Sequence, residues 1–192
     1  MLVLNIVIRT DASEDIGTGH VMRCLVLAED LRKKNENVSF ICRELSGSLI
    51  NYINAHGCTV HTLPFLKSEK TANHLDWLKK NWKTDMRQTI QIISNLPYID
   101  WLIIDHYAID LKWEQNVKSF VKKVMVIDDL ANRSHNCDLL LDQNLFRNME
   151  DRYIHLIPKS ATALLGTKYL LLRQEFKDRR CLIPSAVSAI TS

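Results

Sequence analysis

A chain of 192 residues has room for one domain of ordinary size, followed at most by a short tail. Hydrophobic residues make up 46% and charged residues 24%, which is typical of a globular protein with its own core. The formal net charge of +3 is small, and there is no uninterrupted apolar run of about 18 residues, so neither nucleic acid nor a membrane is expected as a partner.

The five cysteines show no C-x-x-C spacing, so they indicate neither a disulfide framework nor a zinc site, and this usage suits the cytoplasm. The apolar start of the chain has no basic segment before it and no small-residue cleavage site after it, so we expect no signal peptide.

Short apolar runs alternate with helical patterns along the chain. The expected strands are residues 2–8, 38–42, 59–63, 101–104, 123–127 and 139–141. The first expected helix begins at Gly19 or His20, and three further helices are expected over 46–56, 84–95 and 111–120. This rhythm predicts an α/β fold, a Rossmann-like doubly wound parallel sheet. We assign 1–178 to this domain and 179–192 to an irregular tail. Residues 67–83 are charged, and Trp77 and Trp82 there are expected to pack in a core or interface rather than to stack on a sugar or base.

Ligands of such sheets bind beyond the carboxyl ends of the strands. The loops expected at that edge contain Asp11 to His20, Asp105 to Tyr107, and Asp128-Asp129. These three segments are therefore the candidate site.

The loop that ends in Gly17-Thr18-Gly19-His20 carries the strongest signal. Two glycines let a backbone approach a ligand closely, and they open a helix whose free N–H groups favour an anion or a polar oxygen. A dinucleotide fingerprint would need glycine where Met22 stands, and no Gly-Lys-Ser/Thr of a P-loop follows. The positive end of the helix favours a neutral imidazole at His20, the form that a general base requires; alternatively, His20 only caps the loop by hydrogen bonding.

A carboxylate, an imidazole and a phenol follow the strand that ends near residue 104. Asp105 and Tyr107 are candidate site residues by this position; alternatively, Asp105 caps the next element and Tyr107 packs its ring. Asp128-Asp129 is interpreted as a helix N-cap rather than a metal site. Arg23 lies on the same helix face as His20, where it could bind an anion or be a solvated surface charge.

No metal or cofactor is expected. The remaining histidines show no ligand spacing such as H-x-x-x-H, and no G-x-S-x-G motif of a serine hydrolase occurs.

Several segments together resemble one enzyme family. The stretch DASEDIGTGHVMRCLVLA (11–28) is similar to the opening of the UDP-2,4-diacetamido-2,4,6-trideoxy-β-L-altropyranose hydrolases of pseudaminic acid biosynthesis. The resemblance continues at LIIDHY (102–107), VIDDL (126–130), CDLLLDQN (137–144) and LLRQEF (171–176), in the order of the family.

The resemblance implies a metal-independent hydrolase that cleaves a UDP-sugar with water. It also implies an N-terminal domain like that of the two-domain GT-B glycosyltransferases. The family's general base falls on His20, and a tyrosine of the same site falls on Tyr107. Gly17, Gly19, Arg23 and Asp105 are then candidate substrate-binding residues.

The tail after residue 180 does not resemble the family, and no second, UDP-gripping domain follows it. We therefore expect a truncated or frame-shifted product that lacks this domain and has little activity by itself. The alternatives are the acceptor domain of a related UDP-sugar glycosyltransferase and an inactive sugar- or partner-binding remnant.

Overall fold

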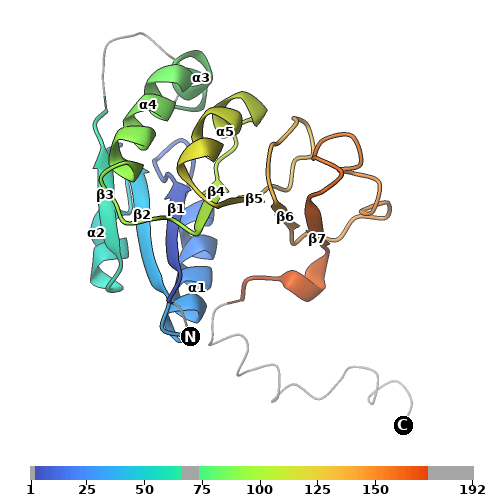
Figure 1. Cartoon of the computed structure of the whole chain (residues 1–192), viewed down its shortest axis with the longest axis horizontal. Helices are drawn as coiled ribbons and strands as arrows, with labels where there is room; N and C mark the ends of the chain where they lie inside the picture. The colour runs from blue at the N-terminus through green and yellow to red at the C-terminus, as the bar shows by residue number, and fades with distance from the viewer. Residues whose placement is uncertain (1–2, 66–73, 173–192) are drawn as a thin grey trace.

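The computed structural model describes residues 3–65 and 74–172. Within these ranges seven strands form a single sheet in the order β3-β2-β1-β4-β5-β6-β7, and every neighbouring pair is parallel (Figure 1). The strands are β1 (Asn5–Thr10), β2 (Asn37–Arg43), β3 (Thr59–Leu63), β4 (Trp101–Asp105), β5 (Lys123–Ile127), β6 (Leu139–Asp142) and β7 (Thr162–Leu165). The predicted doubly wound parallel sheet is confirmed. The expected domain boundary at 178 and the tail 179–192 lie outside the described residues.

The helices follow the expected rhythm, apart from one within the charged segment 67–83, where no helix was predicted. They are α1 (Gly19–Arg32), α2 (Ile50–Ala55), α3 (His74–Lys80), α4 (Trp82–Ile93) and α5 (Leu111–Val117), with short 3-10 turns η1 (Lys118–Phe120) and η2 (Thr167–Tyr169). The start of α1 is confirmed, whereas α2 begins four residues later than the expected 46. None of the helices among the described residues has the length and apolar character needed to cross a membrane.

Each face of the sheet carries its own core, because successive side chains of a strand point to opposite faces. In β1, Ile6 and Ile8 pack with residues of α1 and α2, while Val7 packs with residues of α3, α4 and α5. Trp77 of α3 belongs to the core that contains Val7 and is only 3% exposed. Trp82 packs against the same core, so the packing interpretation of both tryptophans is confirmed.

The strand β7 was not predicted. It is a short segment, Thr-Ala-Leu-Leu, that forms the outer edge of the sheet by pairing with β6 from Leu139↔Thr162 to Asp142↔Leu165. Its half-exposed residues show neither a long apolar run nor strict alternation, so only the register with β6 reveals it.

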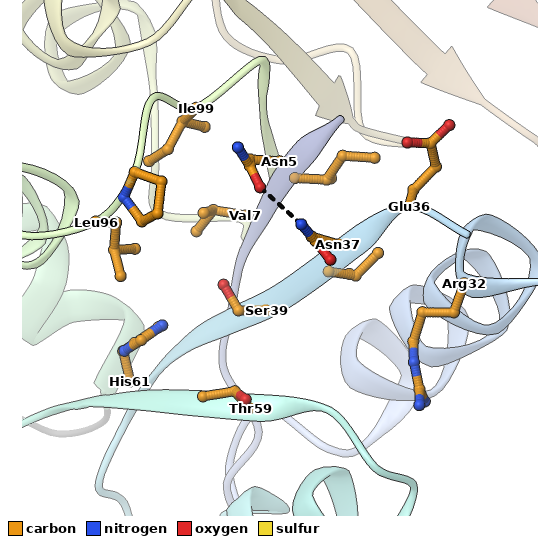
Figure 2. A pocket seen from close by; sticks show the side chains of 13 residues that line it. Asn5, Val7, Arg32, Glu36, Asn37, Ser39, Thr59, His61, Leu96 and Ile99 are labelled. Carbon is orange, nitrogen blue, oxygen red and sulfur yellow. Dashed lines mark hydrogen bonds between the residues drawn. The ribbon is translucent and has the colours of Figure 1, made fainter. Parts of the chain in front are cut away.

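A pocket of about 370 Å³ opens at the amino ends of β1, β2 and β3, the end of the sheet away from the predicted site (Figure 2). Several of its polar groups are used within the fold. Asn37 Nδ2 donates to Asn5 Oδ1 at 3.0 Å, and Glu36 Oε2 accepts the backbone N–H of Leu4 at 2.6 Å. The candidate site lies at the other end of the sheet, at the carboxyl ends of the strands.

Candidate active site

The chain reverses its direction of winding between β1 and β4. From β1 the strands run outward to β2 and β3 on one side, and from β4 to β5, β6 and β7 on the other. The carboxyl ends of two adjacent strands with diverging connections form the usual ligand crevice of an open α/β sheet. The loops after β1 and β4 meet there, as predicted, and the loop after β5 lies beside them.

The loop after β1 is a tight turn closed by its own hydrogen bonds. The backbone N–H of Gly17 donates to Ser13 O at 2.9 Å, and Ser13 Oγ accepts from Ile16 N at 3.0 Å. Gly17 has φ +79°, a left-handed conformation that favours glycine. Gly19 then begins α1, and the Thr18 side chain does not cap the helix. The turn thus brings the uncapped N-terminus of α1 to the candidate site.

An imidazole and a carboxylate from these two loops form the centre of the site. His20, in the first turn of α1, places Nδ1 2.6 Å from Oδ1 of Asp105, the last residue of β4. His20 is 6% exposed and Asp105 is fully buried. Burial opposes ionisation of Asp105, but hydrogen bonds from Arg23 and His20 hold its pKa below the ordinary value. The alternative that Asp105 caps the next element is wrong, because Asp110 caps α5.

The ionised carboxylate fixes the imidazole tautomer. A carboxylate can only accept, so a 2.6 Å contact places the proton of a neutral His20 on Nδ1. Arg23 Nη2 also lies 3.2 Å from Nδ1, but this longer contact is secondary to the one with Asp105. Nε2 is left with a free lone pair, which is what a proton acceptor needs.

Arg23 is not a solvated surface charge, because its largely covered side chain holds two carboxylates. Its Nε and Nη2 bind the two oxygens of Asp105 at 2.5 and 2.6 Å, and its Nη1 lies 3.2 Å from Asp129 Oδ2. The side chain is only 12% exposed. The guanidinium is therefore engaged by two carboxylates, and a direct contact between Arg23 and a substrate stays a prediction.

Tyr107 lies beside His20 in the site. Its ring meets that of His20 edge-on, with centroids 4.3 Å apart and planes at 80°. Burial and the neighbouring Asp129 carboxylate raise the pKa of Tyr107 to about 12. The structure thus brings the predicted residues Gly17, Gly19, His20, Asp105 and Tyr107 to one edge of the sheet.

The interpretation of Asp128-Asp129 as a helix N-cap is wrong, because β5 is followed by an irregular segment that leads to β6. Asp128 is buried and pairs with Arg133 Nη1 at 2.8 Å, and it accepts from the Tyr153 hydroxyl at 3.1 Å. Asp129 instead faces Arg23. In the sequence, only the position of Asp129 after a strand at the ligand edge pointed to a role in the site.

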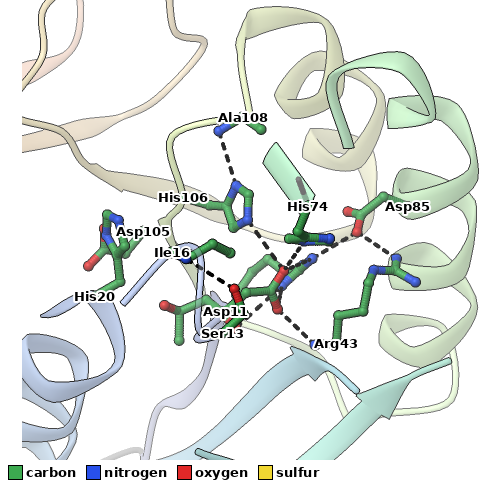
Figure 3. A network of polar contacts seen from close by, with 12 residues as sticks. Asp11, Ser13, Ile16, His20, Arg43, His74, Asp85, Asp105, His106 and Ala108 are labelled. Atoms are coloured by element: carbon green, nitrogen blue, oxygen red, sulfur yellow. Dashed lines mark hydrogen bonds and ion pairs between the residues drawn. The ribbon is translucent and has the colours of Figure 1, made fainter. Parts of the chain in front are cut away.

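His74, one of the histidines without ligand spacing, and His106 meet around Asp11 (Figure 3). Asp11, His74 and His106 are buried, and one ligand-type atom from each lies within 4.8 Å of the others. These three side chains have the ligand atoms of a possible metal site, and Asp11 is the first residue of the loop.

These contacts do not fit a metal ion. Arg9 Nη1 and Nη2 bind the two Asp11 oxygens at 2.6 and 3.0 Å, and although burial opposes this, Arg9 holds the pKa of Asp11 well below its usual range. The backbone N–H of Ala108 donates to His106 Nδ1 at 3.1 Å, so the ring proton lies on Nε2, which faces Asp11 Oδ2 at 3.3 Å. The nitrogen that faces the cluster is a donor, so the residues form an ion-pair network beneath the loop.

The fold and the site define a Rossmann-like α/β domain with a carboxylate-oriented imidazole at its ligand crevice. No protein-family model matches the chain. Among curated proteins, it is 32% identical over 174 residues to the UDP-2,4-diacetamido-2,4,6-trideoxy-beta-L-altropyranose hydrolase of Campylobacter jejuni subsp. jejuni serotype O:2. This match covers 90% of the chain and 53% of that enzyme, so the resemblance seen in the motifs is confirmed.

A second curated protein, the uncharacterized protein MJ1062 of Methanocaldococcus jannaschii, is 29% identical over 177 residues, which is 90% of this chain and 32% of that protein. The chain therefore spans about half and about a third of the lengths of these relatives. A crystal structure of LpCGTa in complex with UDP aligns with 66% of this chain and 31% of its own, at 14% identity and a TM-score of 0.47.

Proposed function

We propose that the chain contributes to the hydrolysis of a UDP-linked 2,4-diacetamido-2,4,6-trideoxy sugar to free sugar and UDP, in the cytoplasm, as a step of pseudaminic acid biosynthesis. The similarity to the Campylobacter jejuni hydrolase supports the reaction. The observation that carries the proposal is the 2.6 Å contact of His20 Nδ1 with the buried Asp105, because it leaves Nε2 as a proton acceptor at the ligand crevice.

The chemistry requires an activated water. Water attacks the anomeric carbon, the bond from that carbon to the phosphate oxygen breaks, and His20 Nε2 takes the proton of the water. UDP is a good leaving group, so no strong acid is demanded, and the proposed step uses no metal. A general base of this kind contributes about 10² to 10⁴ in rate.

The residues around His20 would position the sugar. Tyr107 lies against the imidazole and borders the same space. The backbone at Gly17 and Gly19 could approach sugar oxygens closely, because a Cβ at either position would meet nothing within 4 Å. The Campylobacter jejuni hydrolase is about twice as long as this chain, so we expect the 192 residues to turn over slowly without the contacts of its other half.

Isotope labelling tests the reaction. In H₂¹⁸O, hydrolysis at the anomeric carbon would place ¹⁸O in the released sugar and none in UDP, as read by mass spectrometry. Label in UDP would contradict attack at carbon. UDP release that requires an added sugar acceptor would favour a glycosyltransferase. Binding of the UDP-sugar without any release, unchanged by His20→Ala, would favour a non-catalytic binding domain.

A further inference from the structure

Two carboxylates share one guanidinium at the candidate site. Arg23 binds both oxygens of Asp105 and, through Nη1, Asp129 Oδ2 at 3.2 Å. The side chain of Arg23 is 12% exposed and that of Asp129 is 16% exposed, so water and salt screen these charges only weakly. Burial alone would lower the pKa of Arg23, but Asp105 and Asp129 together raise it. With His20 neutral, the four side chains therefore carry one negative charge more than positive charges.

The excess charge is connected to His20 by direct contacts. Asp129 faces Nη1 of Arg23, the other nitrogens of Arg23 face Asp105, and Asp105 Oδ1 lies 2.6 Å from His20 Nδ1. Arg23 Nη2 lies 3.2 Å from the same imidazole nitrogen, so the guanidinium opposes a positive charge on the ring. If Asp105 were the only partner of Arg23, the two charges would cancel. Asp129 offsets Arg23 and leaves the charge of Asp105 to the imidazole.

The segment after β5 holds Asp129 in this place. Arg152 Nη2 donates to the backbone oxygen of Asp129 at 2.8 Å, while Arg152 Nε lies 3.4 Å from the carboxylate of Asp142. Arg152 thus fixes the backbone of Asp129 but pairs its charge with another acid. Arg23 is the cation that contacts the Asp129 carboxylate.

We propose that Asp129 is a positioning residue that acts through Arg23: it offsets the guanidinium, so that Asp105 stabilises the imidazolium formed when His20 takes a proton from water. The proposal deepens the proposed function and rests on it for the reaction. In that step a proton of water moves to Nε2, the water oxygen bonds to the anomeric carbon, and the bond to the phosphate oxygen breaks with its electron pair on UDP. Proton uptake then removes an unbalanced charge from a largely buried site.

The groups around the imidazole define the expected response to pH. Asp105 faces it from the end of β4, Arg23 from α1, and the ring of Tyr107 from the segment after β4. Burial is the largest cause that raises the pKa of Tyr107 to about 12, so this phenol is neutral around pH 7. Removing the charge of Asp129 should therefore make the imidazolium of His20 a stronger acid, which loses its proton at lower pH.

The test follows the protonation of His20 directly and uses no substrate, so it is independent of the proposed reaction. Histidine labelled with ¹³C at Cε1 is introduced into the full chain, and the His20 signal is assigned with His20→Gln. We expect the acid dissociation constant of the imidazolium to rise at least about threefold in Asp129→Asn. It should change less than threefold in Asp129→Glu, which restores the charge, and in Asp15→Asn, which removes an exposed carboxylate from the loop after β1.

The asparagine variant separates the charge of Asp129 from structural support. Its amide oxygen can still accept from Arg23, so a residue that only held Arg23 in place would keep the parent constant in Asp129→Asn. A change below threefold in Asp129→Asn would overturn the proposal, and so would an equal rise in Asp15→Asn. Asp129→Ser, a smaller neutral variant, should show the same rise and replaces Asp129→Asn if circular dichroism shows that the latter is unfolded.

The pH profile of the reaction gives a second readout. In the assay of UDP release, the acidic limb of kcat/KM reports the base of the free enzyme, so it should move to lower pH in Asp129→Asn by the factor seen for His20. The plateau of kcat should fall, because a weaker base takes the proton less readily, whereas KM should change less than threefold. A limb that stays in place while the constant of His20 changes would overturn His20 as the base and leave the charge balance at Asp129 supported.

Discussion

At the scale of single residues, the site depends on which nitrogen of His20 carries the proton. Asp105 is buried, ionised and 2.6 Å from Nδ1, so it holds the ring with Nε2 free. Cys24 Sγ, at 3.4 Å from Asp105 Oδ2, adds a weak donor to the same carboxylate. The imidazole is therefore already oriented by Asp105, and the ring does not need to rearrange before it accepts a proton.

Asp105→Asn should remove this orientation. The amide can donate to Nδ1 as well as accept from it, so the preference for the useful tautomer is lost, and we expect kcat for UDP release to fall about 10² to 10⁴-fold. Ring ¹⁵N shifts of His20 at neutral pH would show the change of tautomer. Asp151→Asn, at an exposed position, is the control and should change neither quantity. An unaltered kcat in Asp105→Asn would contradict the role of the carboxylate.

The sequence predicted the residues of the site better than their partners. His20, Asp105 and Tyr107 could be found because each lies at or after the carboxyl end of a strand at the ligand edge. The roles of Arg23 and Asp129 could not, because their ion pairs join residues 82 and 106 positions apart and depend on how three loops fold over one another. Adjacent acids in a loop look alike whether they cap a helix or brace a site.

At the scale of elements, the turn into α1 distinguishes two glycines. Gly17 is needed for its backbone, since φ is +79°, whereas Gly19 has an ordinary helical position and open space around it. Both glycines were predicted to lie near a ligand, but the sequence alone does not show that only Gly17 is needed for its backbone conformation.

Gly17→Ala should destabilise the protein by about 1–2 kcal/mol, because a side chain is strained in a left-handed conformation. Gly19→Ala should leave the free energy of unfolding unchanged or raise it by up to about 1 kcal/mol, because alanine favours a helix. Urea unfolding measures both. If UDP release nevertheless falls tenfold or more in Gly19→Ala, a ligand approaches that backbone; equal stability of the two variants would contradict the turn geometry.

The elements that sequence predicted best were those with strong local patterns. The strands β1, β4 and β5 are apolar runs buried on both faces, and α1 has an apolar stripe. The strand β7 was missed because its four residues form a strand only through pairing with β6. The late start of α2 reflects a turn at Leu45–Ser48 that the helical pattern conceals.

At the scale of the whole molecule, a buried ion network ties the loop after β1 to α4. Asp85 of α4 binds Arg9 Nη2 and Arg43 Nη2 through Oδ2, each at 2.7 Å, and all three side chains are fully buried. Asp85 also accepts from Trp113 Nε1 of α5 at 2.9 Å. These contacts join β1, β2, α4 and α5 beneath the site.

Asp85→Asn should therefore be costly. It leaves two buried guanidinium groups with one counter-charge fewer, which typically costs about 3–5 kcal/mol. Urea unfolding of this variant beside the exposed Asp151→Asn would measure the difference. A loss below 1 kcal/mol would mean that the network does not contribute to stability as described.

The same carboxylates set the response to acid. Arg9 and Arg43 lower the pKa of Asp85 against its burial, and the pKa values of Asp11 and Asp105 are also held below the ordinary 3.8. Because the folded values lie below the unfolded ones, their stabilisation is complete above about pH 5 and is lost as the pH falls below about 4. Burial also lowers the pKa of His106, so the urea midpoint should fall moderately between pH 7 and 5 and drop steeply towards pH 3. A constant midpoint from pH 7 to 3 would contradict this.

The most direct test of the account compares the parent chain with His20→Ala in the release of UDP from UDP-2,4-diacetamido-2,4,6-trideoxy-β-L-altropyranose. Each protein is assayed alone and with the part of the Campylobacter jejuni hydrolase that this chain does not match added, after circular dichroism has shown that the variant is folded. We predict UDP release by the parent and a rate at least about a hundredfold lower in His20→Ala. Equal rates for the two proteins would remove His20 from the chemistry and contradict the account.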